Sequence, residues 1–185
     1  MNTKSYLIIL IFFTFLISCA DDVLPKPKAM LRLEYPESTL ENLVTEKFQF
    51  EHNSQAQIKK NKNFSVTLEY PLMKGTIFIT YKEVNNNLEK LLADAQKLSY
   101  EHVVKADNIT EQLFINEKDR VYGMYYEVLG DAASQAQFYA TDSTQHFVTG
   151  SLYFRAKPNY DSIYPAAIYL QKDIRTIMES LRWKE

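Results

Sequence analysis

VYGMYYEVLGDAASQAQFYATDSTQHFVTGSLYF, residues Val121 to Phe154, is the stretch that decides the fold of this chain. Apolar and polar residues alternate through it, which is the pattern of half-buried β-strands, and its many aromatic residues favour strands as well. Turn-forming clusters, GDAAS and TDST, divide it. The predicted strands are Val121–Leu129, Gln135–Thr141 and His146–Arg155, preceded by Ile109–Asn116. Because the separators are short, we expect these strands to pair as antiparallel neighbours.

A β-hairpin is predicted upstream of this meander. Apolar and polar residues alternate over Phe64–Tyr70, the segment PLMKG at Pro71–Gly75 turns the chain, and Ile77–Tyr81 continues the alternation. A further strand is expected in KFQFEH, where the side chains of Phe48–His52 alternate between two faces. The polar and basic segment Gln57–Asn63 is expected to be a loop.

Two segments have the period of a helix instead. Apolar residues recur at three- and four-residue steps over Leu88–His102, with Asn86 or Asn87 as a possible N-cap. The same spacing runs over Ile163–Leu181. The segment Lys157–Pro165, KPNYDSIYP, is predicted to be a loop that leads into this second helix.

Together these elements predict an α+β fold, with an antiparallel sheet of five to seven strands covered by two long helices. The order of the elements, including a late helix close to the end of the sequence, is similar to that of the Mog1/PsbP-like sandwich. Fold alone does not determine function, so the function has to be argued from particular residues.

The first residues have the features of a bacterial lipoprotein signal. The run Tyr6–Ile17 holds about a dozen apolar residues, which suits a secretory signal and falls short of the roughly 20 that a spanning helix needs. Ser18 and Cys19 follow and resemble a lipobox, in which the small residue admits the peptidase and the thiol receives a diacylglyceryl group. Cys19 is the only cysteine, so no disulfide competes; the alternatives are a core cysteine or an incidental one at a cleavage site. We expect a signal peptide at residues 1–18 and lipidation of Cys19.

A tether and a single domain are expected after the signal. Pro25, Pro27 and Pro36 disfavour helix and favour an extended path for residues 19–36. The remainder, residues 37–185, is expected to form one globular α+β domain.

The expected location is the cell envelope. Two or three acyl chains, such as palmitate, anchor a protein stably, whereas one chain is marginal. Ala20, directly after the cysteine, favours the outer membrane. Asp21-Asp22 weakly resembles an acidic surface-export signal, which leaves the leaflet open.

Composition argues against several classes of function. The 185 residues include 21 Lys and Arg and 23 Asp and Glu, and both signs are interspersed, so no basic face for nucleic acid is predicted. His52, His102 and His146 lie far apart with no H-x-H, HExxH or CxxC motif, so no metal site is expected. There is no G-x-S-x-G motif, and the four glycines are scattered singly, so no nucleophile elbow or phosphate loop is predicted. We expect no catalytic residues, no cofactor and no enzymatic activity.

Binding remains as the expected function. Tyr160 and Tyr164, with Asp161 between them, lie in the predicted loop before the last helix. Tyrosines make good interface anchors because they combine a large contact area with few rotatable bonds. Tyr139 and Asp142, in the polar and aromatic stretch before the last predicted strand, are further candidates for binding a partner. The alternative is that the loop tyrosines hold the loop against the sheet.

Several segments together resemble one family. After the lipobox they are VLPKPKAMLRLEYP, NNNLEKLLADAQKLSYEHVVKAD and the run from Val121 to Ala166. This combination resembles GldD, the gliding-motility lipoprotein family of Bacteroidetes, from Cys19 to Trp183. The resemblance implies a role in surface gliding and in the linked type IX secretion apparatus, together with other envelope lipoproteins and without catalysis. It transfers only Cys19, as the site of lipid attachment.

Two classes of function therefore remain open. The first is an assembly or stabilising lipoprotein of the gliding and secretion machinery, with other gliding-motility lipoproteins or type IX secretion components as partners. The second is an envelope lipoprotein that binds a ligand in a pocket beside the sheet. A large apolar pocket with converging polar groups would favour the second class, and an exposed aromatic patch near the candidate tyrosines would favour the first.

Overall fold

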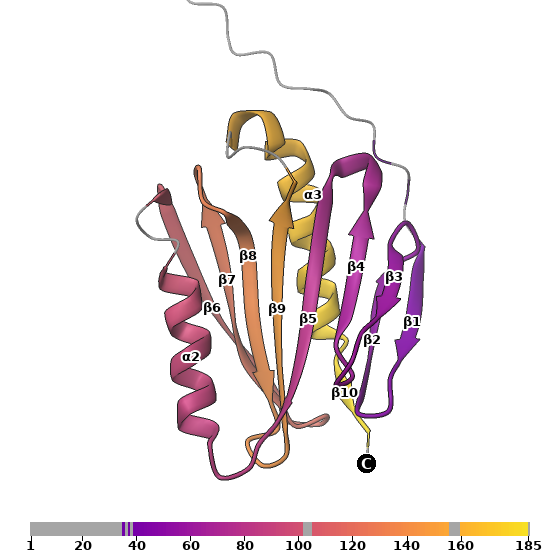
Figure 1. The fold of residues 1–185 in the computed structure, drawn as a ribbon, viewed down its shortest axis with the longest axis vertical. Coiled ribbons are helices and arrows are strands. Elements are labelled where there is room, and N and C mark those ends of the chain that lie inside the picture. The colour runs from indigo at the N-terminus through magenta and orange to yellow at the C-terminus, as the bar shows by residue number, and fades with distance from the viewer. Residues whose placement is uncertain (1–34, 36, 38, 102–104, 156–159, 185) are drawn as a thin grey trace, which may run out of the picture.

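The structure is a computed structural model that describes Tyr35, Glu37 and residues 39–101, 105–155 and 160–184 (Figure 1). The predicted signal peptide, Cys19 and most of the predicted tether lie outside these residues. The elements in chain order are β1 (Leu40–Val44), β2 (Phe48–Asn53), β3 (Gln57–Lys60), β4 (Val66–Tyr70), the 3-10 turn η1 (Pro71–Met73), β5 (Gly75–Glu83), α2 (Leu88–Tyr100), β6 (Asn108–Asn116), β7 (Val121–Leu129), β8 (Ser134–Thr141), β9 (His146–Phe154), α3 (Tyr160–Glu179) and β10 (Arg182–Trp183).

Seven strands form one antiparallel sheet in the order β3-β4-β5-β9-β8-β7-β6. The hairpin predicted from Phe64 to Tyr81 is confirmed as β4–β5, and the predicted meander is confirmed as β6–β7–β8–β9. The pairing of β5 with β9 joins these two units over nine consecutive residue pairs, from Gly75 opposite Phe154 to Glu83 opposite His146. Short turns between alternating segments were sufficient to specify this part of the sheet.

The close contact between the central strands β8 and β9 requires a glycine at position 150. Gly150 on β9 lies opposite Phe138 on β8. A Cβ atom at position 150 would approach the Phe138 ring to 2.0 Å, so the ring occupies the space that any other residue would need. Phe138 is 2 % exposed and belongs to the main hydrophobic core.

The second sheet has three strands in the order β1-β2-β10. Its central strand β2 buries Phe48 and Phe50 completely, as the alternation in KFQFEH predicts. At the other end of the chain, β10 pairs with β2 through Arg182 opposite Gln49 and Trp183 opposite Phe48. This pairing joins the two ends of the described chain into one layer.

Helix α3 lies between the two sheets and supplies the centre of the core. It packs against β2 of the small sheet and against β8 and β9 of the large one. Its apolar stripe, including Leu170, Ile174 and Ile177, is fully buried. At about 25 cal/mol per Å² of apolar surface, each such side chain contributes roughly 2 kcal/mol on burial.

Helix α2 lies on the opposite face of the large sheet (Figure 1). Leu91 and Ala95 pack on Phe147, with Tyr139 beside them. One turn further along the helix, the buried Ser99 hydroxyl donates to Gln137 Oε1 at 3.0 Å. The helix therefore covers β8 and its neighbours and leaves the strands towards β3 uncovered (Figure 1).

The predicted fold class is wrong. Within the described residues there are ten strands in two sheets instead of one sheet of five to seven strands, and the sheet is not covered by two long helices. Of the helices in the described part of the chain, only α3, with 20 residues, is a long helix that covers a sheet face, and it shares that position with the small sheet. Helix α2 has 13 residues and covers part of the other face. The prediction failed because β1, β3 and β10 are short or polar strands whose sequences show no clear alternation.

Candidate functional site

The structure places the five candidate binding residues in two separate regions. Tyr160, Asp161 and Tyr164 lie at the start of α3, whereas Tyr139 and Asp142 lie on β8 and in the turn after it. These regions are at opposite ends of the large sheet (Figure 1). The candidates therefore do not form one site.

The start of α3 differs from the predicted loop. Residues 160–165 are helical, so the loop Lys157–Pro165 is wrong over this part; residues 156–159 lie outside the described residues. A carboxylate from a different element stabilises the first turn: the backbone N–H of Tyr160 donates to Asp131 Oδ1 at 2.7 Å. An acidic acceptor at a helix N-terminus satisfies a free N–H group and interacts favourably with the helix dipole.

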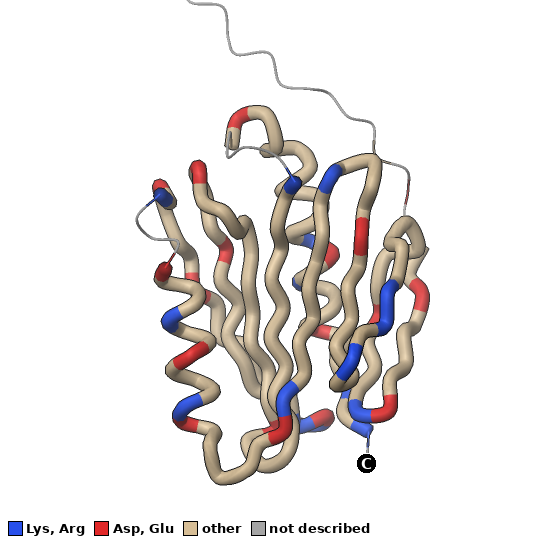
Figure 2. The backbone as a smooth tube through the Cα atoms, in the orientation of Figure 1, with Lys and Arg blue, Asp and Glu red and all other residues tan. Residues whose placement is uncertain are grey.

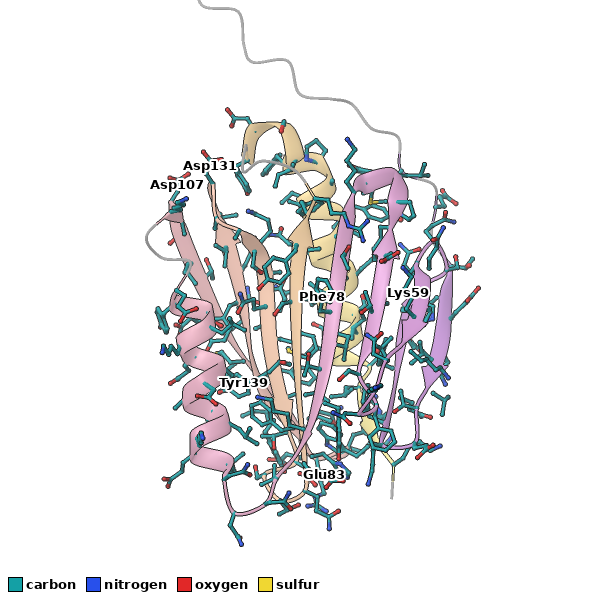
Figure 3. All side chains as sticks on the ribbon, viewed as in Figure 1. Lys59, Phe78, Glu83, Asp107, Asp131 and Tyr139 are labelled. Carbon is teal, nitrogen blue, oxygen red and sulfur yellow. The ribbon has the colours of Figure 1, made fainter. Side chains whose placement is uncertain are left out.

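The β7–β8 loop holds Asp131 in place. Gly130 has a φ of +101°, and a Cβ there would lie 2.6 Å from the backbone nitrogen of Asp107, so only glycine fits. The buried Gln135 side chain donates to the carbonyl oxygens of Gly130 at 3.1 Å and Ala132 at 2.9 Å. Figure 3 shows Asp107 and Asp131 side by side at this end of the sheet. The first turn of α3 is thus held by Asp131, in a loop whose backbone is fixed by the Gln135 hydrogen bonds.

Tyr160 and Tyr164 form an edge-to-face pair with ring centroids 5.4 Å apart. Tyr160 is partly buried, and burial raises the pKa of its hydroxyl to about 12. The Tyr164 side chain is 36 % exposed. The partly buried Tyr160 ring therefore packs against the Tyr164 ring, and Tyr164 exposes part of its own ring to solvent.

The β4–β5 turn lies at the same end of the sheet as the start of α3 (Figure 1). It carries Leu72, which is 85 % exposed at the centre of η1. This end of the molecule therefore presents an aliphatic and an aromatic side chain to solvent, from η1 and from the first turns of α3.

Tyr139 is packed into the sheet beneath α2. Its ring stacks on Phe147 with centroids 5.9 Å apart and an interplanar angle of 6°. Burial raises the pKa of its hydroxyl. The ring is partly buried and packs against the cluster that Leu91 and Ala95 of α2 form with Phe147. Tyr139 therefore has a packing role in the structure. Binding of a partner through Tyr139 stays a prediction.

Asp142 organises the β8–β9 turn. Its Oδ1 accepts the backbone N–H groups of Thr144, Gln145 and His146 at 2.8–3.0 Å. Burial acts to raise the pKa of this carboxyl, but these hydrogen bonds outweigh it and lower the pKa below the usual value. Only 6 % of the residue is exposed, so its carboxylate is already used within the protein.

Two apolar side chains outside the predicted candidates are also strongly exposed. Leu113 and Ile115, both on β6, are 69 % and 57 % exposed. The alternation of β6 identified it as a strand, but it could not show which face is covered. Their exposure follows from the position of β6 at the edge of the sheet, which the sequence does not reveal.

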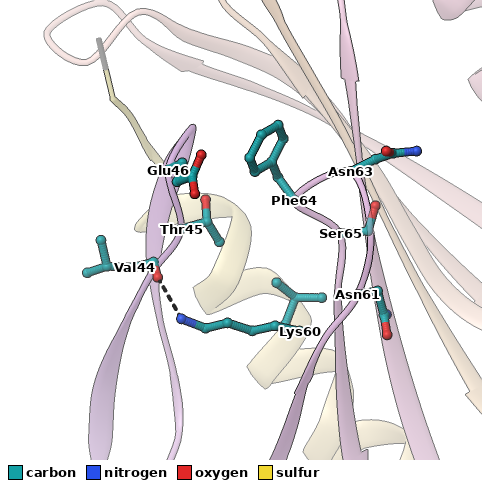
Figure 4. Close-up of a pocket in the computed structure, with 9 residues that line it drawn as sticks. Val44, Thr45, Glu46, Lys60, Asn61, Asn63, Phe64 and Ser65 are labelled. Atoms are coloured by element: carbon teal, nitrogen blue, oxygen red, sulfur yellow. Dashed lines mark hydrogen bonds between the residues drawn. The ribbon is translucent and has the colours of Figure 1, made fainter.

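Three pockets on the described surface are open and lined by turns and strand ends. One, of about 490 Å³, lies between the β1–β2 turn and the β3–β4 loop (Figure 4). Across it, Lys60 Nζ donates to the carbonyl oxygen of Val44 at 3.2 Å. A second, of about 750 Å³, is lined by Arg120, Asp142 and Trp183 among others, and a third, of about 1050 Å³, lies at the start of α2.

The described residues include neither a cluster typical of a metal site nor a helix typical of a membrane span. No group of three or more His, Cys, Asp and Glu side chains in the described part of the chain could hold a metal ion. Neither α2 nor α3, nor any other described helix, is long and apolar enough to cross a membrane.

Comparisons with known proteins place the chain in a family. No curated protein matches it. Among solved structures, it is similar to cyanobacterial PsbP (CyanoP) from Synechocystis sp. PCC 6803, with 9 % identity and a TM-score of 0.46, over 80 % of this chain and 95 % of that one. The family model of the gliding motility lipoprotein GldD matches residues 20–183, nearly the whole sequence after Cys19. The chain therefore belongs to the gliding motility lipoprotein GldD family, whose members are lipoproteins of the cell envelope.

Proposed function

We propose that this gliding-motility lipoprotein is a non-catalytic docking component that assembles or stabilises the motility and type IX secretion machinery. Its partners would be other gliding-motility lipoproteins or components of the secretion apparatus. Membership of the GldD family supports the link to gliding. The proposed role in assembly or stabilisation is argued from the exposed side chains of the folded domain.

The observation that carries the proposal is the exposed ring of Tyr164 on a rigid support. Tyr160 packs against it at 5.4 Å, and Asp131 holds the helix turn that carries both residues. A tyrosine that is already fixed in position loses little conformational entropy on binding. Such residues are typical of binding hot spots.

The anchor is part of the same proposal. Cleavage after residue 18 would leave Cys19 to carry the acyl chains, residues 19–36 as a tether and residues 37–185 as the folded domain. Ala20 after the cysteine favours placement in the outer membrane. A tethered domain would search for its partner over a short distance, which raises the effective concentration of the two.

A ligand-binding role has less support. A ligand pocket is usually a concave, mostly apolar cavity that buries most of its ligand. The pocket in Figure 4 has Glu46, Lys60, Asn61 and Asn63 in its lining and is open to solvent. The lining of the second pocket is richer in charged residues. These surfaces resemble ordinary gaps between solvated turns.

The test is the substitution Tyr164→Ala in the full chain, with Leu98→Ala as the matched control. Leu98 is also a large side chain on a helix and has nearly the same exposure, 38 % against 36 %. Loss of a docking tyrosine should cost about 2 kcal/mol of binding, or roughly 30-fold in affinity. We expect both variants to melt like the wild type, and only Tyr164→Ala to reduce colony spreading or secretion. Normal spreading by Tyr164→Ala, with normal protein levels, would contradict the proposal.

A further inference from the structure

The pocket of about 750 Å³ is formed by three segments that are far apart in the sequence. We call it the basic pocket, because its lining holds four basic and two acidic side chains. The segments are the β6–β7 turn with Lys118–Arg120, the β8–β9 turn with Asp142 and Thr144–His146, and the end of the chain with Arg182–Lys184. The pocket is too open and polar to enclose a small apolar ligand, but complementary charges can recognise a protein at such a surface.

Direct contacts join the three segments around the basic pocket. Arg182 Nε lies 2.9 Å from Asp119 Oδ2, and the indole N–H of Trp183 donates to the carbonyl oxygen of Arg120 at 2.9 Å. The Trp183 ring also stacks on the buried His146 ring, with centroids 5.1 Å apart and an interplanar angle of 12°. The β6–β7 turn and the first residue of β9 are therefore both attached to β10.

Both acidic side chains of the lining are already used within the protein. Asp142 Oδ1 accepts three backbone N–H groups of its own turn, and its Oδ2 accepts the Thr144 hydroxyl at 2.9 Å. Asp119 Oδ2 pairs with Arg182 and also accepts the Asn116 side-chain N–H at 2.9 Å. These carboxylates therefore leave other basic side chains of the pocket available.

Three basic side chains remain available. Lys118 is exposed, Lys184 is partly exposed, and neither forms an ion pair with a described residue. The Arg120 guanidinium donates to the Thr144 hydroxyl at 3.2 Å and lies 3.9 Å from Asp142, but 61 % of its side chain is exposed. Glu117 is exposed on the same turn and is not part of the lining. The pocket thus presents an excess of positive charge to solvent.

We propose that the basic pocket binds an acidic segment of a partner protein, whose Asp and Glu side chains pair with Lys118, Arg120 and Lys184. Carboxylates form strong, charge-assisted hydrogen bonds with lysine and arginine. Trp183 belongs to the same lining, and tryptophan and arginine are enriched among the residues that dominate binding energy at interfaces. The volume is many times the roughly 30 Å³ of one water molecule, so a chain segment fills the pocket better than a single small anion does.

The position of the basic pocket favours a protein over the membrane that holds the proposed anchor. The pocket includes the β8–β9 turn, at the opposite end of the large sheet from the start of α3 (Figure 1). Tyr35, the first described residue, contacts Tyr169 at 4.6 Å, and Tyr169 lies about 15 Å along α3 from Glu179. The chain therefore joins the domain away from the pocket. A partner bound here would be additional to one that docks at Tyr164, on a different surface.

The test uses the fluorescence of Trp183, which is the only tryptophan of the chain. The full chain, purified in detergent, is titrated with a short peptide of glutamate and aspartate and with a peptide of the same length made of glutamine and asparagine. We expect a saturable change in fluorescence with the acidic peptide alone. The affinity should decrease as salt is added, because salt screens interactions between exposed charges. Calorimetry measures the same affinities without relying on fluorescence.

Two pairs of substitutions test the assignment to the basic pocket. Lys118→Gln with Lys184→Gln removes two available charges, and Lys97→Gln with Lys172→Gln makes the same change in net charge at exposed positions on α2 and α3. We expect the first pair to weaken binding of the acidic peptide by about tenfold and the control pair by less than about twofold. Both pairs should melt like the wild type, since no ion pair between described residues is lost.

Three outcomes would overturn the proposal. The first is that the acidic peptide does not bind, and the second is that both pairs of substitutions weaken its binding equally. The third is a stronger response to inorganic phosphate, or to detergent micelles that contain phosphatidylglycerol, than to the acidic peptide. None of these measurements depends on whether Tyr164 docks a partner.

Discussion

Asp173 shows how a single buried residue joins the helix to the small sheet. The residue is 9 % exposed on α3, and its Oδ2 accepts the side-chain N–H of Asn53 at 2.9 Å. Asn53 also donates to the Tyr169 hydroxyl at 2.9 Å, and the Tyr169 ring contacts Tyr35 at 4.6 Å. The first described residue of the chain is thus connected to the core through this polar network.

The pH dependence of stability should reflect Asp173. Burial raises its pKa to about 6, against the opposing effect of the Asn53 amide, whereas the usual value is 3.8. Because the folded state disfavours the carboxylate, the contribution of Asp173 to stability should decrease as the pH rises from about 4 through 6. The loss should approach 2–3 kcal/mol, at about 1.4 kcal/mol for each pKa unit.

The variant Asp173→Asn isolates this effect because it keeps an oxygen acceptor and cannot ionise. The melting temperatures of wild type and variant should be similar near pH 4 and diverge by pH 7, with the variant more stable. A difference that stays constant between pH 4 and pH 7 would contradict the assigned environment of Asp173.

Residue patterns predicted some features of the candidate region and missed others for a physical reason. The apolar spacing that leads from Ile163 onwards predicted α3, but its start at Tyr160 depends on Asp131, which lies 29 residues earlier in the sequence. A cap supplied by a distant residue leaves no local signal. The alternation of β6 likewise predicted a strand and could not distinguish an edge from the interior.

The two helices have different roles at the scale of the elements. α3 lies in the main core between both sheets, whereas α2 belongs to a smaller cluster with Phe147 on the outer face. The alternating and periodic segments were predictable because each has one buried face. β1 has a single buried residue and β10 has only two residues, so neither contains enough alternation to be recognised.

The outer cluster can be tested through Leu91, which is 6 % exposed. In Leu91→Asp an unpaired charge would be buried against Phe147, and we expect a loss of about 4 kcal/mol in the free energy of unfolding. Ala93→Asp, on the exposed face of the same helix, is the matched control and should change stability by less than about 1 kcal/mol. Denaturant titration of the three proteins measures both values. Equal, small losses in both variants would show that α2 does not pack as described.

At the scale of the whole molecule, membership of the GldD lipoprotein family indicates a location in the cell envelope. Charges are concentrated on α2, on the turns and along β3, while the central strands of the large sheet are nearly free of them (Figure 2). Exposed apolar side chains lie at the start of α3, in η1 and on β6.

Attachment to the membrane should depend on Cys19 alone. In Cys19→Ser the thiol that receives the lipid is absent, and the residue lies outside the described domain, so we expect a folded protein that no longer fractionates with membranes. Cell fractionation followed by immunoblotting measures this, and thermal melting of the released protein checks its fold. A variant that still sediments with detergent-soluble membrane would contradict lipidation at this position.

Docking by an anchored domain is tested most directly by photo-cross-linking in living cells. A photoreactive phenylalanine analogue would replace Tyr164 in the full chain, and in a second strain it would replace Leu98 as the control of equal exposure. Captured proteins are identified by mass spectrometry. We expect position 164 to capture a gliding-motility lipoprotein or a type IX secretion component that position 98 does not. Capture of the same proteins at both positions, or of none at position 164, would contradict it.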